Sequence, residues 1–141
     1  MRTDSTRISG DALEAVRSYV SATYGKEYLP EKPVVYKSKK GAQDAHEAIR
    51  PADPTLHPDD VRPFLEDDTA RLYELIWLRF VAGQMAPALY DTSTIEFDLT
   101  AEGGTDRSQY RFRSTGSILK FQGFTRLYVE ATETGDHRPL D

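Results

Sequence analysis

Two short stretches of this 141-residue chain carry more polar chemistry than folding requires. The first is RTDS, in which Arg2, Thr3, Asp4 and Ser5 place a cation, two hydroxyl groups and a carboxylate at consecutive positions. The guanidinium of Arg2 suits bidentate binding of a phosphate, and both hydroxyl groups can donate to phosphate oxygens. Because Asp4 would repel a phosphate, its chemistry is better suited to orienting a cation or a histidine. Taken alone, the stretch is better explained as a polar terminus or the lead-in to a helix.

The second stretch is QDAHEAIRP, for which we predict a short helix that ends before Pro51. On a helix, His46 and Arg50 lie four residues apart and present two cations on one face. Like charges at that spacing cost about 0.2–0.5 kcal/mol unless an anion lies between them, so the pattern permits an anion site. The structural alternative, favoured for this stretch alone, is that His46 packs locally and Arg50 pairs with Glu47 or a distant acid.

Together the two stretches are more specific. MRTDSTRIS, followed about forty residues later by GAQDAHEAIRPAD, resembles the bacterial DNA topoisomerase I family, which is of type IA. In that family the catalytic tyrosine is followed directly by M-R-T-D-S-x-R-[IV]-S, and an A-H-E-A-I-R-P motif follows at a similar separation. The segments LYELIWLRFVAGQMAPALYDTST and GSILKFQGFTRLY extend the resemblance over nearly the whole length.

The resemblance implies an enzyme that relaxes negatively supercoiled DNA without ATP, by transient single-strand cleavage through a 5′-phosphotyrosine and religation. It implies that Arg2 contacts the scissile phosphate and that His46 supports the same site as a second catalytic residue. Asp4 would orient His46. Thr3, Ser5 and Arg50 would bind the backbone of single-stranded DNA, so this group, with Asp4, forms the expected DNA-binding set.

The resemblance also indicates what the chain is expected to lack. The nucleophilic tyrosine would lie immediately before Met1, and the Toprim domain that binds Mg²⁺ should precede it, so no metal ligand is expected in this chain. The chain is therefore expected to be an internal fragment that neither cleaves nor relaxes DNA by itself. A bacterial, cytoplasmic and nucleoid-associated location is implied for the parent enzyme.

The elements that position these stretches change in kind along the chain. Apolar residues at helical spacing predict amphipathic helices over Asp11–Tyr24 and from Thr69 to about Ala86, the second largely buried. After Pro87 the pattern alternates, with Ile95, Phe97 and Leu99 on one face of a half-buried strand and further strands over YRFRSTG, SILKFQGF and TRLYVEA. We predict an α+β fold: a helical domain over residues 1–86 and a small antiparallel β domain over residues 87–141.

Composition excludes several classes of protein. The chain has no cysteine, which rules out disulfides and thiolate metal sites, and it has no apolar run long enough to span a membrane. The net charge of −5 argues against nucleic-acid binding, but residues 1–50 carry nine Lys and Arg against seven Asp and Glu. Any contact with a polyanion is therefore expected in the first third.

Two other functions are compatible with the residues. The chain could be an autonomous module that binds single-stranded DNA or a protein without catalysis, through a basic loop at Lys37–Lys40 and exposed aromatic side chains of the strand part. It could also be a metal-dependent hydrolase that uses His46 and His57 with nearby acids. Against the hydrolase, Pro51 and Pro54 separate the two histidines, Pro58 follows the second, and no metal-ligand spacing recurs.

Overall fold

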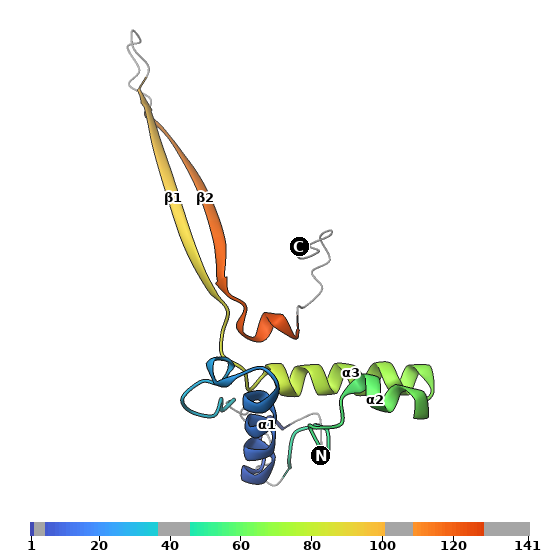
Figure 1. Cartoon of the computed structure of the whole chain (residues 1–141). Coiled ribbons are helices and arrows are strands. Elements are labelled where there is room, and N and C mark those ends of the chain that lie inside the picture. Colours follow the sequence, from blue (N-terminus) through green and yellow to red (C-terminus); the bar gives the residue numbers. More distant parts are fainter. Residues whose placement is uncertain (2–4, 37–45, 101–108, 129–141) are drawn as a thin grey trace. The chain divides into compact units, whose positions relative to one another are not determined.

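The structure, a computed structural model, describes residue 1 and residues 5–36, 46–100 and 109–128. The helices come first, α1 (Gly10–Thr23), α2 (Pro58–Val61) and α3 (Asp67–Ala82), with the 3₁₀ turns η1 (Lys26–Tyr28) and η2 (Arg62–Phe64). The strands β1 (Leu89–Thr100) and β2 (Gln109–Phe121) follow, and a third 3₁₀ turn, η3 (Gly123–Arg126), comes after them (Figure 1). The α+β class predicted from the sequence is confirmed.

Contacts between residues divide the chain into two units. The helical unit consists of Met1–Pro87 together with the segment that starts at Gly123, and the hairpin consists of Ala88–Gln122. The division predicted from the sequence, at residues 86 and 87, kept everything after Pro87 in the β part. The structure instead returns η3 to the helical unit.

The helical unit is built around apolar faces of α1 and α3. Val16 and Val20 of α1 and Trp77 and Val81 of α3 are wholly buried. The indole nitrogen of Trp77 donates to the Pro54 carbonyl at 2.9 Å, so the one polar atom of this side chain is satisfied in the core.

The first half of α3 does not match the prediction of a largely buried helix. Leu72 and Leu75 are 58% and 46% exposed, while Trp77, Phe80 and Val81 are buried. In Figure 1, α3 is the longest helix, and α2 is the element that packs beside its first half. The short α2 is too small to cover the apolar stripe there: Ala70 is buried, but the other buried residues of α3 lie in its second half.

Gly123 allows the chain to return from β2 to the helical unit. Its φ of 53° lies in the left-handed region, and a Cβ there would collide with the backbone of Ala86 and Pro87. The next amide, of Phe124, donates to the Ala86 carbonyl at 2.8 Å. The bend predicted at Gly123 is confirmed, but the described part of TRLYVEA forms the end of η3 and a turn, so the predicted strand is wrong there.

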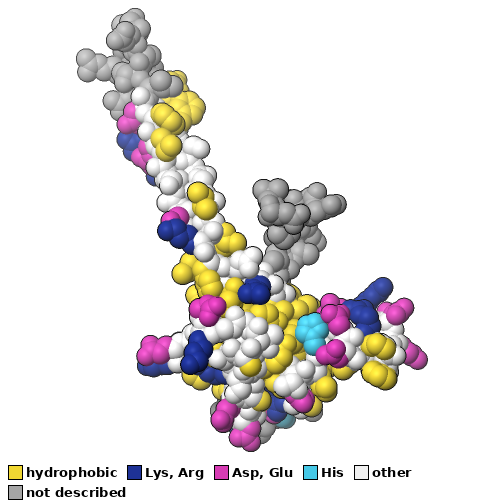
Figure 2. Space-filling view, viewed as in Figure 1, with side chains coloured by type: hydrophobic (Ala, Val, Ile, Leu, Met, Phe, Trp, Pro, Cys, Tyr) yellow, Lys and Arg dark blue, Asp and Glu magenta, His cyan; other side chains and the backbone are white. Residues whose placement is uncertain are grey.

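The hairpin is a two-stranded antiparallel sheet with one irregularity in register between Leu89 and Tyr90. The predicted alternation is present, and Phe97 lies directly opposite Phe112. The predicted half-burial is wrong, because Ile95 and Phe97 are 57% and 56% exposed. No described residue of this chain covers that face, and in Figure 2 apolar side chains lie on one side of the hairpin's outer half with charged ones on the other.

Candidate functional site

The structure brings the two polar stretches together through backbone and side-chain contacts. The hydroxyl of Ser5 donates to the carbonyl oxygen of His46 at 2.6 Å and accepts from the amide of Arg7 at 3.1 Å. The amide of Ala48 donates to the Arg7 carbonyl at 2.8 Å. We call these contacts between residues 5–9 and 46–50 the motif junction. It joins segments that lie about forty residues apart in the sequence.

Glu47 is the charged centre of the motif junction. Its carboxylate accepts from Arg50 Nε at 2.8 Å and Nη2 at 3.3 Å, and from the amide of Ser9 at 2.9 Å. These bonds, the Arg50 contact above all, lower the pKa of Glu47 to about 2. Because Ser9 immediately precedes α1, the Glu47 carboxylate connects the second stretch to the start of that helix.

The helix predicted for QDAHEAIRP is wrong over its described part. Residues 46–50 are not helical, and Ala48 forms an isolated β-bridge. The shared helical face of His46 and Arg50 therefore does not exist. The physical reason is the long-range pairing with residues 5–9, which satisfies the backbone better than a single helical turn ending at a proline would.

The side chains of Ser5 and Arg50 are engaged within the protein. Ser5 is buried, and its hydroxyl makes the two contacts above. Arg50 has its side chain 17% exposed, makes the bidentate contact with Glu47 and donates to the Pro51 carbonyl at 3.0 Å. The interpretation that Arg50 pairs with Glu47 is therefore the one that the geometry supports. Sequence reasoning had not assigned a role in the site to Glu47, although the Glu–Arg spacing of three residues is a usable signal.

Three predicted site residues lie outside the described residues: Arg2, Thr3 and Asp4. Their proximity to His46 stays a prediction. The basic loop Lys37–Lys40 also falls outside the described part of the chain. The nearest described position is Ser5, which directly follows Asp4 and contacts the His46 carbonyl. The chain therefore places the end of the RTDS stretch against the histidine's backbone.

Two hollows lie beside the motif junction on the helical unit. The nearer one, of about 360 Å³, includes Ser5, Ala48, Tyr36 and Arg79 in its lining. The second, of about 530 Å³, shares Tyr36 and Arg79 with the first and extends to Tyr128.

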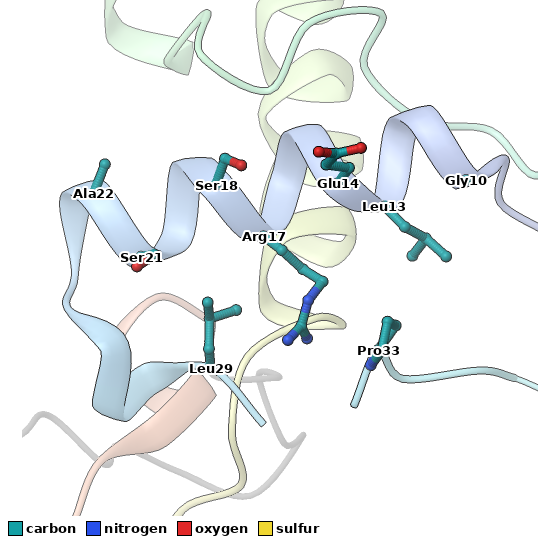
Figure 3. Close-up of a pocket in the computed structure, with 9 residues that line it drawn as sticks. All are labelled: Gly10, Leu13, Glu14, Arg17, Ser18, Ser21, Ala22, Leu29 and Pro33. Atoms are coloured by element: carbon teal, nitrogen blue, oxygen red, sulfur yellow. The ribbon is translucent and has the colours of Figure 1, made fainter. Parts of the chain in front are cut away.

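A larger hollow of about 730 Å³ runs along α1, away from the motif junction (Figure 3). Figure 3 shows Arg17 pointing toward Leu29 and Pro33, while Glu14 points to another side of the helix. Arg17 donates through Nη2 to the Pro30 carbonyl at 2.9 Å. The lining of this hollow contains none of the predicted site residues. The largest of the three volumes therefore does not identify the candidate site.

The histidine pair of the hydrolase hypothesis is not supported by the surroundings of His57. That residue is the N-cap of α2, accepts from the Asp59 amide at 3.3 Å, and packs edge-on against Trp77 with ring centroids 4.8 Å apart. Over the described residues, no group of three or more His, Asp or Glu side chains is placed to hold a metal ion. His57 is therefore a structural residue of the helical unit.

Comparison with known proteins decides the family. Residues 1–140 match the family model described as DNA topoisomerase. The chain belongs to this family. The resemblance drawn from MRTDSTRIS and AHEAIRP is thereby confirmed.

Individual relatives agree with the family match. The chain is 47% identical over 127 residues to DNA topoisomerase 1 of Vibrio cholerae, covering 90% of the chain and 14% of that protein. The full-length topoisomerase I structure from Thermotoga maritima matches with a TM-score of 0.70 and 33% identity, over 100% of this chain and 21% of that one. The chain thus spans a small part of each of these topoisomerases.

Among the described residues, no helix combines the length and the apolar character that crossing a membrane requires.

Proposed function

We propose that this chain is a segment of a type IA DNA topoisomerase that relaxes negatively supercoiled DNA by cleaving and rejoining one strand. The observation that carries the proposal is the motif junction, in which Ser5 contacts the His46 carbonyl at 2.6 Å. In a chain of this family, the end of the first stretch, at Ser5, therefore contacts the second stretch at His46, which supports a shared site. The family match and the bacterial relatives support the same proposal.

In the proposed reaction, a tyrosine outside this chain attacks the phosphorus of a DNA phosphodiester. The tyrosine oxygen forms a 5′-phosphotyrosine while the bond to the 3′ oxygen breaks, and that oxygen leaves as the hydroxyl; rejoining reverses both changes. Negative charge accumulates on the phosphoryl oxygens, so cations placed in advance lower the barrier. Arg2 would supply one such cation and His46 would support it as the second catalytic residue.

The other residues of the two stretches take supporting roles. Thr3 would bind a neighbouring phosphate of the single strand, and Asp4 would orient His46. Ser5 and Arg50 were expected to contact DNA, but both side chains are already engaged within the motif junction. We assign them to positioning: they help to hold residues 5–9 against the segment that carries His46.

Mg²⁺ is expected in the parent enzyme from the family resemblance, where it would neutralise phosphate charge. The described residues contain no cluster of acids that fits this ion, and we assign its binding to a domain outside this chain. The bacterial cytoplasm, with single-stranded DNA as the partner, is the setting that this function implies.

The test is to purify the parent protein and measure plasmid relaxation and covalent attachment to an oligonucleotide labelled on the 3′ side of the cleavage point. Arg2→Ala should slow cleavage by about 10²–10³-fold, while the free energy of unfolding changes by less than about 0.5 kcal/mol. Arg71→Ala is a matched control, because Arg71 is an exposed cation on α3. The 141-residue chain alone should be inactive. Relaxation by that chain, or a loss of stability that explains the whole defect of Arg2→Ala, would refute the proposal.

A further inference from the structure

We propose that the two hollows beside the motif junction form one binding surface for unpaired nucleotides of the DNA strand next to the cleavage point. We name it the Tyr36 surface, after the residue at its centre; it consists of the hollows that share Tyr36, Arg79 and Gly83. The identity of the strand rests on the proposed function.

The Tyr36 surface is continuous with the motif junction. The first hollow includes Ser5, whose hydroxyl contacts the His46 carbonyl. The second begins at the three shared residues and reaches Phe124 and Tyr128. A strand whose phosphate lies at the junction would therefore meet an aromatic and basic surface within the same unit.

Tyr36 offers a fixed ring on which a base can stack. The residue is 50% exposed, yet its hydroxyl donates to the Gly83 carbonyl at 2.9 Å and its own carbonyl accepts from the hydroxyl of Thr6 at 3.2 Å. An exposed ring that is already held at both ends loses little conformational entropy when a base stacks on it. Stacking of bases on aromatic side chains is the usual sequence-tolerant mode of single-strand binding.

Arg79 supplies the cation of the surface. Its Nε donates to the hydroxyl of Tyr128 at 3.1 Å, and its guanidinium lies 5.7 Å from the centre of that ring. These contacts hold the guanidinium at the border of the two hollows while the residue stays exposed. In single-stranded DNA, the bases can stack on the aromatic rings while the guanidinium contacts a phosphate of the backbone.

The charge of the lining favours nucleic acid over other occupants. The chain carries 23 Asp and Glu, but none is among the described residues that line the two hollows, and Arg79 is the single charged residue there. The hollow along α1 differs, since it places Glu14 in the same lining as Arg17. Because no carboxylate lines this surface, none would repel the phosphates of a bound strand, although the chain as a whole is acidic.

Gly83 keeps the surface open at its centre. A Cβ there would lie 2.9 Å from the Arg79 carbonyl and 3.3 Å from the Tyr36 hydroxyl. A side chain at this position would therefore press on the contact that fixes the Tyr36 ring. Glycine permits Tyr36, Arg79 and the end of α3 to pack this closely.

The test uses the 141-residue chain and a fluorescent oligothymidylate of about eight nucleotides, with anisotropy measured across salt concentrations. Tyr36→Leu should weaken binding about tenfold or more because a stacking ring is lost, whereas Tyr36→Phe, which keeps the ring and loses only the hydrogen bond to Gly83, should weaken it much less. Arg79→Gln should reduce the slope of log affinity against log salt by about 0.7. With a 5-iodouracil oligonucleotide, ultraviolet crosslinking should label Tyr36 or Tyr128.

Tyr110→Leu is the matched control, since this tyrosine is 58% exposed but belongs to the hairpin. The inference would be overturned if Tyr110→Leu weakened binding as much as Tyr36→Leu, or if crosslinks formed only outside the Tyr36 surface. It would also be overturned if the chain did not bind the oligonucleotide at all, and an apolar protein segment would then be the alternative occupant of the surface. Circular dichroism of each variant checks the fold, and Tyr36→Phe reports on stacking if Tyr36→Leu fails to fold. Binding through Tyr36 by a chain whose parent never cleaves DNA would refute the proposed function and leave this inference standing.

Discussion

The helical unit and the hairpin treat their apolar side chains in opposite ways. In the helical unit, Val16, Trp77 and Val81 are wholly buried. In the hairpin, Phe97 and Phe112 face each other across the strands, yet each is 56% exposed. Both regions have the apolar periodicity of their secondary structure, so periodicity alone does not determine burial.

The difference lies in what packs against each region. The helical unit folds distant segments onto one another, and contacts such as Trp77 to the Pro54 carbonyl satisfy its buried polar atoms. The hairpin relies on pairs between its two strands, for example Thr92 with Ser117 and Asp98 with Arg111. A two-stranded sheet is marginally stable by itself. We therefore expect substitutions in the helical unit to cost much more free energy of unfolding than substitutions in the hairpin.

The largest effect is expected at Trp77. Trp77→Ala should lower the free energy of unfolding of the helical unit by about 3–5 kcal/mol, because it opens a cavity in the core. Leu72→Ala, on the exposed half of the same helix, should change it by less than about 0.5 kcal/mol. Urea unfolding followed by the helical circular dichroism signal measures both. Equal losses would show that the first half of α3 is also packed in solution.

The next effect is expected at Gln84, which is wholly buried. Its side-chain oxygen accepts from the Val34 amide at 3.1 Å, and its nitrogen donates to the Val34 carbonyl at 2.9 Å. Gln84→Leu should cost about 1–3 kcal/mol in urea unfolding, because two partly buried backbone groups of Val34 lose their partners. Ser18→Ala, at an exposed position of α1, is the control and should be nearly neutral. A neutral Gln84→Leu would mean that water replaces the amide.

A smaller, pH-dependent effect is expected at Glu47. Folding lowers its pKa from 4.5 to about 2, so its contribution is present above pH 4.5 and is lost as the pH falls toward 2. Glu47→Gln should reduce stability by about 1–2 kcal/mol at pH 7 and should flatten the dependence of stability on pH between these values. Urea midpoints across that pH range measure the effect. An unchanged slope in Glu47→Gln would show that other acids dominate the acid unfolding.

The smallest effect is expected in the hairpin. Phe97→Thr removes one directly opposed aromatic pair and should weaken strand pairing by about 0.2–1 kcal/mol. The melting temperature of the helical unit should not move. Amide hydrogen exchange along β1 and β2 measures the first effect, and Ser93→Ala, at an exposed position opposite Gly116, is the control. A fall in the helical melting temperature would show that the hairpin face packs against the helical unit.

Much of the local structure could be predicted from the sequence, because it depends on neighbours along the chain. The helix expected over Asp11–Tyr24 is observed as Gly10–Thr23. The predicted bend occurs at Gly123, whose positive φ favours glycine. The second helix was predicted to begin two residues late and to end about four residues late, because Gly83 already caps its C-terminus. The family, too, could be predicted from two short motifs.

The sequence identified the two motifs that meet in the motif junction, but not the contacts between them. The residues of the AHEAIRP motif were identified correctly as part of a family signature, yet their predicted helix was wrong. The Tyr36 surface could not be found in the sequence, because Tyr36, Arg79 and Tyr128 are separated by more than forty residues from one another and carry no spacing rule.

The sequence by itself determined the two long helices, the alternating strands of the hairpin and the family, since periodicity, turn residues and motif spacing are local properties. Only the tertiary structure decided that residues 46–50 pair with residues 5–9, that Glu47 also accepts from the amide of Ser9, and that η3 rejoins the helical unit. Those outcomes depend on backbone hydrogen bonds and packing between residues about forty or more positions apart. Such contacts satisfy buried polar groups at a chain-closure cost that local propensity does not reveal.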